Sequence, residues 1–440
     1  MKRVLLPFLC VITLAWFGAL LVEPAPPGTS LPWAFRQQAL YITGLWSFAL
    51  MSLIMVLATR PAWLEAPLGG MDRIYRVHKW AGILAVLFAA SHWLIEMADD
   101  VIKALFGREG RVPGNHDGGF VALMQDVGED LGEWAIYALL AMLLITLWRK
   151  FPYHLWRYLH HVMPVLYLML TIHVGFLAPA VWWSQPVGWM LAMFMVAGSA
   201  ASVVSLTGRI GRRRRVAGTI EAVHTTADGI CELDCLLAPQ WKGHRAGQFA
   251  FVTFDTIEGA HPFTIASADH GDRRVRFEIK ALGDYTRGLA GRLRAGQKIQ
   301  VEGPYGRFDF RKASSKAAQI WIAGGIGITP FLAWLESLQG AASGAPEADL
   351  YYSTRCRDED AFVARLEALC AGLPSITLHI VSTDRDPVLN AERLHRDHGA
   401  ARRTELWFCG PRAFGDALRT GIVRLGMRGV RFHQEAFEMR

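Results

Sequence analysis

Residues 73–95 form an apolar stretch that can cross a bilayer as a helix and that carries a histidine near each end. His78 and His92 stand fourteen residues apart, so on a helix both rings fall on one face, roughly 21 Å apart. An ionisable side chain inside a membrane span is costly and is by default a functional candidate. Two at different depths predict two cofactors stacked along the membrane normal. The alternative is a pair of polar packing residues or interfacial histidines.

A second apolar stretch, residues 158–178, carries a similar pair. His160 and His173 are thirteen residues apart, a rise of roughly 20 Å, so two helices running the same way place His78 level with His160 and His92 level with His173. Thirteen residues also rotate the second ring by roughly 140° on an ideal helix. Pro164 lies between the two and predicts a kink that restores the common face. The neighbouring His161 fits the spacing no better and leaves the inner ligand open.

Apolar segments of this length are concentrated before residue 207. They predict six spans, at about 4–22, 36–58, 74–95, 131–148, 158–178 and 187–206. The first has Lys2 and Arg3 before its apolar core, as a signal peptide has. It lacks a convincing small-residue cleavage site, so we interpret it as an uncleaved span.

The basic residues between the spans predict the orientation. The 59–73 and 149–157 connections and the end of the sixth span are rich in arginine and lysine, whereas the 96–130 connection is rich in acidic residues. Basic loops stay in the cytoplasm, so both termini are predicted there, in a bacterial-type inner (plasma) membrane. His78 and His160 then lie on the inner side, and His92 and His173 on the outer side. The net charge of +7 follows from these juxtamembrane residues, so no nucleic-acid partner is expected.

The pattern changes after residue 211. Five short alternating segments predict strands of a small antiparallel barrel over 212–312: 216–224, 229–237, 248–254, 274–280 and 298–302. Residues 313–440 then alternate strands at 319–323, 349–352, 376–381 and 405–409 with helices at 330–339, 359–371 and 412–425. That alternation predicts a doubly wound α/β domain. The fold expected is a six-helix transmembrane bundle (1–211), an antiparallel β-barrel and a doubly wound nucleotide-binding domain.

A glycine-rich turn follows the first strand of that last domain. Gly324, Gly325 and Gly327 let a pyrophosphate approach backbone N–H groups at a helix start. Thr329 is placed to cap the helix, and Pro330 suits its first turn. The third glycine of the dinucleotide fingerprint is missing, so a plain strand–turn–helix is the alternative.

Taken together, the motifs resemble those of the ferric reductase and NADPH oxidase family of transmembrane haem–flavin enzymes. The histidine pairs resemble its haem ligands, and His261-Pro262-Phe263-Thr264-Ile265 resembles its flavin-binding HPFT motif. The further matching segments are Gly283-Asp284-Tyr285-Thr286 (phosphates of FAD), Gly303-Pro304-Tyr305-Gly306 and Gly324–Pro330 (nicotinamide nucleotide), Cys409-Gly410-Pro411 (nicotinamide) and the C-terminal Phe437 (over the flavin ring). Their shared order behind six spans carries the resemblance over nearly the whole chain.

The resemblance implies FAD, two b haems and NADPH or NADH as cofactors. His78, His92, His160 and His173 would be the metal ligands, and Thr264, Cys409 and Phe437 would act at the flavin and the nicotinamide. A flavin is needed because a nicotinamide passes a hydride, whereas a haem accepts single electrons. The remaining cofactor-binding residues expected are His261, Pro262, Phe263, Ile265, Gly283, Thr286, Gly303, Gly306, Gly324, Gly325, Gly327, Thr329, Pro330, Arg355, Arg357, Gly410 and Pro411.

Two function classes remain open. The chain is either a complete enzyme that passes electrons from NAD(P)H to a small outer acceptor, oxygen or a ferric chelate, or the membrane electron donor of a periplasmic or quinone-dependent protein. Several superoxide-producing relatives carry a second histidine where this chain has Glu96, and Arg36 is placed at the outer edge of the second span. Both departures argue against a dedicated oxygen site. The sequence leaves the oligomeric state open.

The choice of nucleotide depends on the end of the second parallel strand, where the adenosine ribose lies in this fold. Arg355 offers a planar fork suited to a phosphate, and Arg357 either assists or faces solvent. Asp358 is interpreted as a cap of the next helix. These residues favour NADPH over NADH, with a solvated arginine pair as the alternative.

Overall fold

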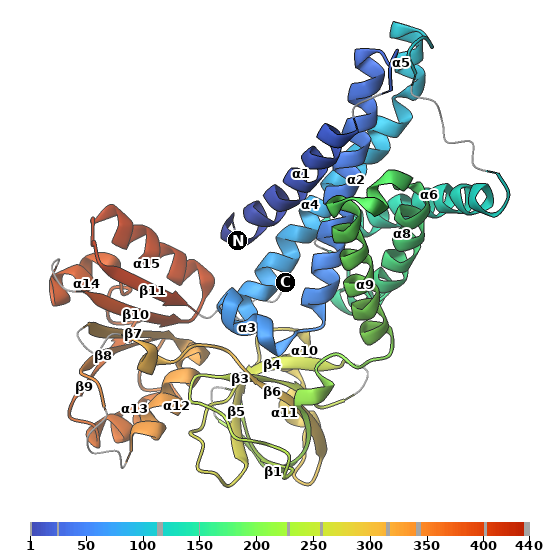
Figure 1. The fold of residues 1–440 in the computed structure, drawn as a ribbon. Coiled ribbons are helices and arrows are strands. Elements are labelled where there is room, and N and C mark those ends of the chain that lie inside the picture. Colours follow the sequence, from blue (N-terminus) through green and yellow to red (C-terminus); the bar gives the residue numbers. More distant parts are fainter. Residues whose placement is uncertain are drawn as a thin grey trace. The chain divides into compact units, whose positions relative to one another are not determined.

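The computed structural model describes residues 2–23, 26–111, 118–148, 150–226, 229–255, 258–313, 317–339, 345–399 and 403–434. The chain divides into two compact units, Met1–Ile210 and Gly211–Arg440, each with its own interior. Figure 1 shows a helical first unit and a second unit built around two sheets.

Among the described residues of the first unit, six helices are long and apolar enough to cross a membrane, which confirms the predicted number of spans. The helices are α1 (Lys2–Val22), α2 (Leu31–Ala58), α4 (Met71–Met97), α6 (Phe120–Leu147), α7 (Tyr153–His160) with α8 (Met163–Leu177) as one span, and α9 (Pro186–Leu206). Shorter helices are α3 (Ala62–Leu68), α5 (Asp99–Phe106) and the 3₁₀ turn η1 (Ala180–Ser184). Helices suit a bilayer because each satisfies its own backbone hydrogen bonds.

The helix α2 is the most enclosed of the six and packs along α4 and α9. Buried polar contacts join α2 to α8 and, through it, to α9. Ser52 Oγ lies 2.8 Å from the hydroxyl of Tyr167 on α8, and that hydroxyl donates to the carbonyl of Phe194 on α9. A Cβ atom at Gly198 would overlap the Tyr167 ring, so this glycine lets α8 and α9 approach closely.

Two predictions for this unit were wrong. The 96–130 connection was expected to be a loop that holds Asp126, Glu129 and Asp130, but α6 begins at Phe120 and contains all three. No proline interrupts residues 120–131, and acidic side chains near the start of a helix are compatible with its dipole, so the helix extends beyond its apolar part.

Arg36 was expected at the outer edge of the second span, but α2 begins at Leu31 and buries this side chain. Its guanidinium donates to the carbonyls of Ile95 and Glu96 at 3.2 and 3.0 Å and lies 3.1 Å from the Glu96 carboxylate. A cation here stabilises the carbonyls of the last turn of α4, as basic side chains near a helix C-terminus do.

The second unit begins with a six-stranded antiparallel sheet in the order β4-β3-β6-β1-β2-β5. The five predicted strands are present, and a sixth, β4, was missed because it is short and contains Pro262. Proline cannot donate to a ladder and is confined to strand edges, which is where β4 lies. The bounds are β1 Arg215–Thr225, β2 Ile230–Leu237, β3 Phe249–Thr253, β4 Ala260–Thr264, β5 Arg274–Lys280 and β6 Lys298–Tyr305, with η2 Arg212–Arg214, α10 Asp284–Arg287, α11 Leu289–Arg292 and η3 Phe310–Lys312 nearby.

A five-stranded sheet follows in the order β11-β10-β7-β8-β9, and all its neighbouring pairs are parallel. Helices cover both faces (Figure 1): α12 and α13 pack into one buried cluster, α14 and α15 into the other. The strand β11 and the helix α14 were not predicted, because both are short and polar. The bounds are β7 Ala318–Gly324, η4 Gly325–Ile328, α12 Thr329–Leu338, β8 Ala348–Thr354, α13 Ala361–Ala371, β9 Ile376–Ser382, α14 Ala391–His398, β10 Thr404–Cys409, α15 Arg412–Arg424 and β11 Val430–Gln434.

Candidate functional site

The four predicted histidines form two facing pairs. The ring centres of His78 and His160 lie 6.3 Å apart, and those of His92 and His173 also lie 6.3 Å apart. The first member of each pair comes from α4, and the second from the α7–α8 span, so these two spans run the same way. A metal ion about 2 Å from one nitrogen of each ring puts the two ring centres about 6 Å apart. Each of the two gaps therefore has the width that one iron ion requires.

Backbone carbonyls hold three of the four rings. The Nδ1 atom of His78 lies 3.2 Å from the carbonyl of Ile54, and that of His92 lies 3.0 Å from the carbonyl of Leu40. His173 makes the same contact with Gly128 at 2.9 Å. A proton on Nδ1 leaves Nε2 as the free lone pair on each ring. This is the arrangement in which metal-bound histidines are usually held.

Glycines make room beside the rings of the second pair. A Cβ atom built at Gly44 on α2 would lie 3.1 Å from Cε1 and from Nδ1 of His92. One built at Gly132 on α6 would overlap the ring of His173. The helices on either side therefore approach the rings through bare backbone. Sequence reasoning missed both glycines, although a glycine inside an apolar span is itself a signal of close approach.

A break in the helix brings His160 and His173 to the same face. The α7 helix ends at His160, the chain turns through His161 and Val162, and α8 begins at Met163 with Pro164 in its first turn. The turn removes the rotation that an unbroken helix would impose. His161 lies outside the pair: it is exposed, and its Nδ1 lies 2.7 Å from the carbonyl of Arg157.

The predicted flavin motif lies on β4, the edge strand of the six-stranded sheet. Phe263 and Thr264 pair with Ala250 and Phe249 of β3, and Thr264 is buried. An edge strand leaves one row of backbone groups unpaired, and such groups can bind the polar rim of a flavin. Ile265, just after the strand, donates its N–H to the carbonyl of Gln248 at 2.9 Å and bridges Phe277 of β5.

A stacked ring pair joins this strand to the Gly283–Thr286 turn. The ring of His261 lies flat on that of Tyr285, with centres 4.0 Å apart. The Tyr285 hydroxyl is buried and finds no hydrogen-bond partner among the described residues. Burial raises the pKa of Tyr285 to about 12, so the hydroxyl stays a donor. Thr286 Oγ1 accepts from the backbone N–H of Leu282 and Gly283 at 3.0 Å each, which fixes the turn.

The Gly303–Gly306 segment was grouped with the nucleotide motifs, and it lies at the end of β6 in the antiparallel sheet. Tyr305 is fully buried, pairs with Phe249 of β3, and donates to Glu302 at 2.8 Å. A Cβ atom at Gly303 would lie 3.1 Å from the Cβ of Ala250. Gly306 has a φ of +104°, which an L side chain rarely adopts. This segment therefore adjoins the flavin motif.

The glycine turn after β7 meets the turn after β10. A Cβ atom at Gly327 would overlap the carbonyl of Cys409, one at Gly410 would lie 3.0 Å from the backbone nitrogen of Gly324, and one at Gly324 would lie 2.9 Å from Cδ of Pro411. Strands β7 and β10 are neighbours whose connections leave on opposite sides, which makes this the switch point of the sheet. Open α/β sheets bind ligands at that point.

Two details of the turn differ from prediction. The residue before the helix is Ile328, and Thr329 is already helical, so its hydroxyl donates back to the carbonyl of Ile326 at 3.1 Å and does not cap. The 3₁₀ turn η4 runs directly into α12 and leaves no extended residue for a cap. Pro330 does lie in the first turn. The Cys409 side chain is fully buried within an apolar cluster, so its backbone is what the turn meets.

At the end of β8 the two arginines differ. Arg355 is exposed, and its guanidinium forms no ion pair within the described part of the chain. Arg357 pairs with Glu367 at 2.6 Å. The prediction that Asp358 caps the next helix was wrong: Asp360 caps α13 by accepting from the N–H of Phe362, and Asp358 pairs with Arg385. Phe437, the predicted aromatic over the flavin, lies outside the described residues.

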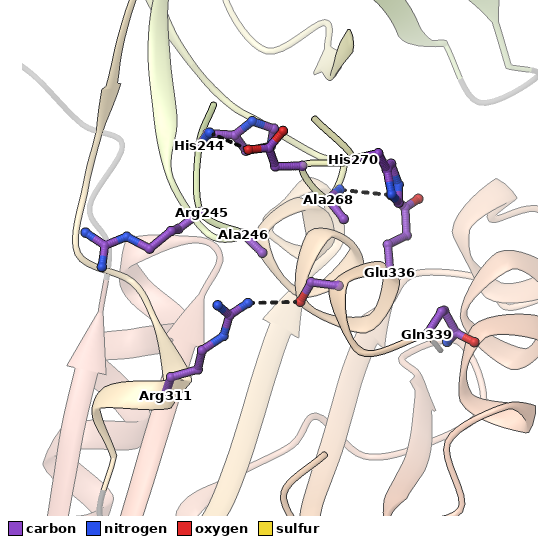
Figure 2. A pocket seen from close by; sticks show the side chains of 10 residues that line it. His244, Arg245, Ala246, Ala268, His270, Arg311, Glu336 and Gln339 are labelled. Atoms are coloured by element: carbon purple, nitrogen blue, oxygen red, sulfur yellow. Dashed lines mark hydrogen bonds between the residues drawn. The ribbon is translucent and has the colours of Figure 1, made fainter. Parts of the chain in front are cut away.

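A cavity of about 300 Å³ opens where loops of the antiparallel sheet meet the last turn of α12 (Figure 2). Glu336 and Arg311 line it together with His244 and Ala268. The glycine turn lies at the other end of α12, so the cavity is separate from the predicted nucleotide site.

An ion network crosses the same junction and was not predicted. Arg365 on α13 contacts Glu278 on β5 and lies 2.6 Å from Glu336 on α12, whose other oxygen accepts from the N–H of Ala268 at 3.1 Å. Arg276 on β5 lies 3.6 Å from the same Glu336. Burial raises the pKa of Glu278 to about 7, with Arg365 acting in the other direction. The two sheets are thereby joined by charged pairs that no sequence motif marks.

Comparison with known families matches both parts of this arrangement. Residues 43–171 match the family described as "Ferric reductase like transmembrane component", and residues 218–309 match the family described as "FAD-binding domain". The chain belongs to the ferric reductase and NADPH oxidase family. Its six apolar helices make this family member a multi-pass membrane protein.

Relatives of this ferric reductase-type chain match it over different shares of their lengths. It is 30% identical over 209 residues to respiratory burst oxidase homolog protein E of Arabidopsis thaliana. The matched region covers 41% of this chain and 21% of the relative. It is 25% identical over 233 residues to the ferredoxin--NAD(P)(+) reductase component of the naphthalene 1,2-dioxygenase system of Pseudomonas putida, which covers 51% of this chain and 69% of the relative. The chain thus spans about a fifth of the length of the respiratory burst oxidase homologues.

Among solved structures, the cytochrome P450 reductase GcoB of Amycolatopsis matches with 20% identity and a TM-score of 0.44, covering 51% of this chain and 70% of that chain.

Proposed function

We propose that this chain is a transmembrane oxidoreductase that passes electrons from NAD(P)H, through FAD and two bis-histidine b haems, to oxygen or a ferric chelate on the outer side of the membrane. The observation that carries the proposal is the pair of facing histidine couples in the ferric reductase-like region. In each couple the ring centres lie 6.3 Å apart, and backbone carbonyls fix three of the four rings in the two couples. Packing histidines without a metal would not need two equal gaps.

The orientation of the couples follows from the charges at the span ends. Arg209 and the Arg212–Arg215 run follow α9, and Arg60 and Arg73 flank α3. Basic flanks favour the cytoplasmic side, so both termini lie there. The His78–His160 couple is then the inner site and the His92–His173 couple the outer one. The second unit, which follows α9, is cytoplasmic and reaches NAD(P)H.

FAD supplies the conversion between a two-electron hydride donor and single-electron acceptors. We assign it to the antiparallel sheet as a barrel domain, residues 212–312. The edge strand β4 would hold the flavin rim, with Thr264 as its last residue, and the Tyr285 hydroxyl offers a buried donor that no described residue uses. The Gly283–Thr286 turn would hold phosphate, since Thr286 fixes its backbone.

The pyridine nucleotide is assigned to the parallel sheet as a doubly wound domain, residues 313–440. Gly324, Gly327 and Gly410 let the β7 and β10 turns approach so closely that a side chain at any of the three would meet the facing turn. Arg355, exposed and without an ion pair in the described part of the chain, would meet the 2′-phosphate of NADPH. Arg357, already paired with Glu367, would contribute less.

Purified full-length protein tests the proposal. It should contain two b haems and one FAD per chain. It should oxidise NADPH with oxygen or with a ferric chelate as the sole acceptor. Added superoxide dismutase distinguishes reduction by superoxide formed from oxygen from direct reduction of the chelate. Fewer than two haems per chain contradicts the paired sites. Two haems that NADPH reduces, without turnover on either acceptor, would instead indicate an electron donor to a periplasmic or quinone-dependent protein.

A further inference from the structure

The four paired histidines are not held alike. His78, His92 and His173 each place Nδ1 against a backbone carbonyl. Within the described part of the chain, no hydrogen bond reaches either ring nitrogen of His160. It is also the last residue of α7, immediately before the break in the span. Its ring therefore lacks the device that orients the other three.

A tryptophan takes the place of that carbonyl. The indole of Trp156 lies flat on the His160 ring, with ring centres 4.9 Å apart and planes 12° apart. Trp156 precedes His160 by four residues, so both project from one face of α7. The indole Nε1 donates to Thr146 Oγ1 at 2.9 Å, and that hydroxyl donates to the carbonyl of Met142 at 2.7 Å. The indole is thus anchored to α6.

We propose that Trp156, anchored by Thr146, is the positioning residue of the inner haem ligand His160. The inference rests on the proposed function, in which His78 and His160 hold the inner haem. The terminal torsion of a histidine side chain is broad, so a ring without a hydrogen bond turns unless a neighbour blocks it. Stacking on a fixed indole allows one plane and leaves Nε2 free to face the gap.

Two consequences follow for the bound haem. The His78 and His160 ring planes stand 72° apart, and those of His92 and His173 stand 84° apart. The anisotropy of the EPR signal of a low-spin ferric haem depends on the angle between its two ligand planes. Turning the His160 ring should therefore change the signal of the haem between His78 and His160 and leave the other signal unchanged. A histidine whose second nitrogen donates to no carbonyl is also a weaker base. Since His160 would bind the inner haem only, changes at its ring should shift the midpoint potential of that haem alone.

The experiment uses the full-length protein in detergent and compares Trp156→Leu, Trp156→Phe and Thr146→Val. Trp148→Leu is the matched control, because Trp148 is an exposed tryptophan at the end of α6 that packs on Phe151. Haem content, the ferric EPR spectrum and the midpoint potential of each haem are measured. We expect Trp156→Leu to change the signal and the potential of one haem, or to lose that haem. Trp156→Phe should restore most of both, and Thr146→Val should fall between.

The outcomes separate the two proposals. Fewer than two haems in the wild type contradicts the proposed function and this inference together. Two haems in the wild type, with both signals and both potentials unchanged in Trp156→Leu, overturns the inference alone. An equal change in Trp148→Leu overturns it as well. If Trp156→Leu fails to fold, Thr146→Val decides by the same signal, because it keeps the indole and removes only its anchor.

Discussion

Gly132 lies against the ring of His173 at a point where a Cβ atom has no room. The glycine is on α6 and the histidine on α8, so the closeness of these two helices depends on the absence of one side chain. One turn earlier on the same face of α6, the carbonyl of Gly128 lies 2.9 Å from Nδ1 of His173. One helix therefore both orients the ring and makes space for it.

Gly132→Ala should displace His173 and lower the content of the outer haem. Gly128→Ala is its matched control one turn away, because a Cβ atom there meets only ordinary contacts at 3.5 Å and the carbonyl remains. Alanine is favoured over glycine in a helix by about 1 kcal/mol, so the control should not lose stability. Haem per chain is measured by the pyridine haemochrome assay. Equal haem content in the two variants would contradict the close approach.

His92→Ala or His173→Ala should remove one haem and block reduction of outer acceptors, while flavin reduction by NAD(P)H survives. His161→Ala should keep both haems, because His161 is exposed and bonded to Arg157. Metal analysis gives the haem content, the reduced-minus-oxidised spectrum gives haem reduction, and stopped-flow bleaching of the flavin gives its reduction by NAD(P)H. If His161→Ala lost a haem and His160→Ala did not, the inner ligand would be His161.

A fragment of residues 211–440 should fold and bind FAD, because this unit has its own interior. It should reduce soluble dyes slowly with NAD(P)H. Thr264→Ala should weaken flavin retention in the fragment by roughly 1 kcal/mol, the net contribution of one hydrogen bond. Circular dichroism and flavin absorbance after gel filtration give the result. A folded fragment that takes up no flavin would refute the assignment.

Arg355→Ala should lower the ratio of kcat/KM for NADPH to that for NADH by roughly ten- to a hundredfold, since a hydrogen bond between charged groups contributes about 1.5–3 kcal/mol. Arg357→Ala is the control, because that guanidinium is paired with Glu367. Both nucleotides are assayed with each variant. An unchanged ratio in Arg355→Ala, or an equal drop in Arg357→Ala, would assign the preference elsewhere.

The junction of the two sheets should depend on pH through Glu278. Burial raises its pKa in the folded unit to about 7 from an ordinary 4.5. Between these values the unfolded chain releases a proton that the folded unit keeps, so stability falls as pH rises through this window, by on the order of 3 kcal/mol. Glu278→Gln should flatten that fall in denaturant titrations of the 211–440 fragment. Glu221→Gln, in an exposed pair with Arg274, should leave it unchanged.

Much of this protein could be predicted from local pattern. The six apolar spans, the strand alternation and the glycine turn are properties of neighbouring residues, and the histidine spacings follow from the rise of a helix. The closure of the antiparallel sheet into a barrel and the assignment of site residues to cofactors stay predictions. The short elements β4, β11 and α14 escaped because proline, length or polarity hides their pattern.

The sequence by itself determined which residues can bind metal and which segments cross the membrane, because side-chain chemistry and apolar length are local. The spacing predicted the two pairs, but only the tertiary structure decided between His160 and His161 as the partner of His78. His160 rather than His161 faces His78 because the chain turns between α7 and α8, and no local pattern gives the angle of that turn. Gly132 and Trp156 matter for the same reason: their roles are distances to other side chains, set by how the helices pack.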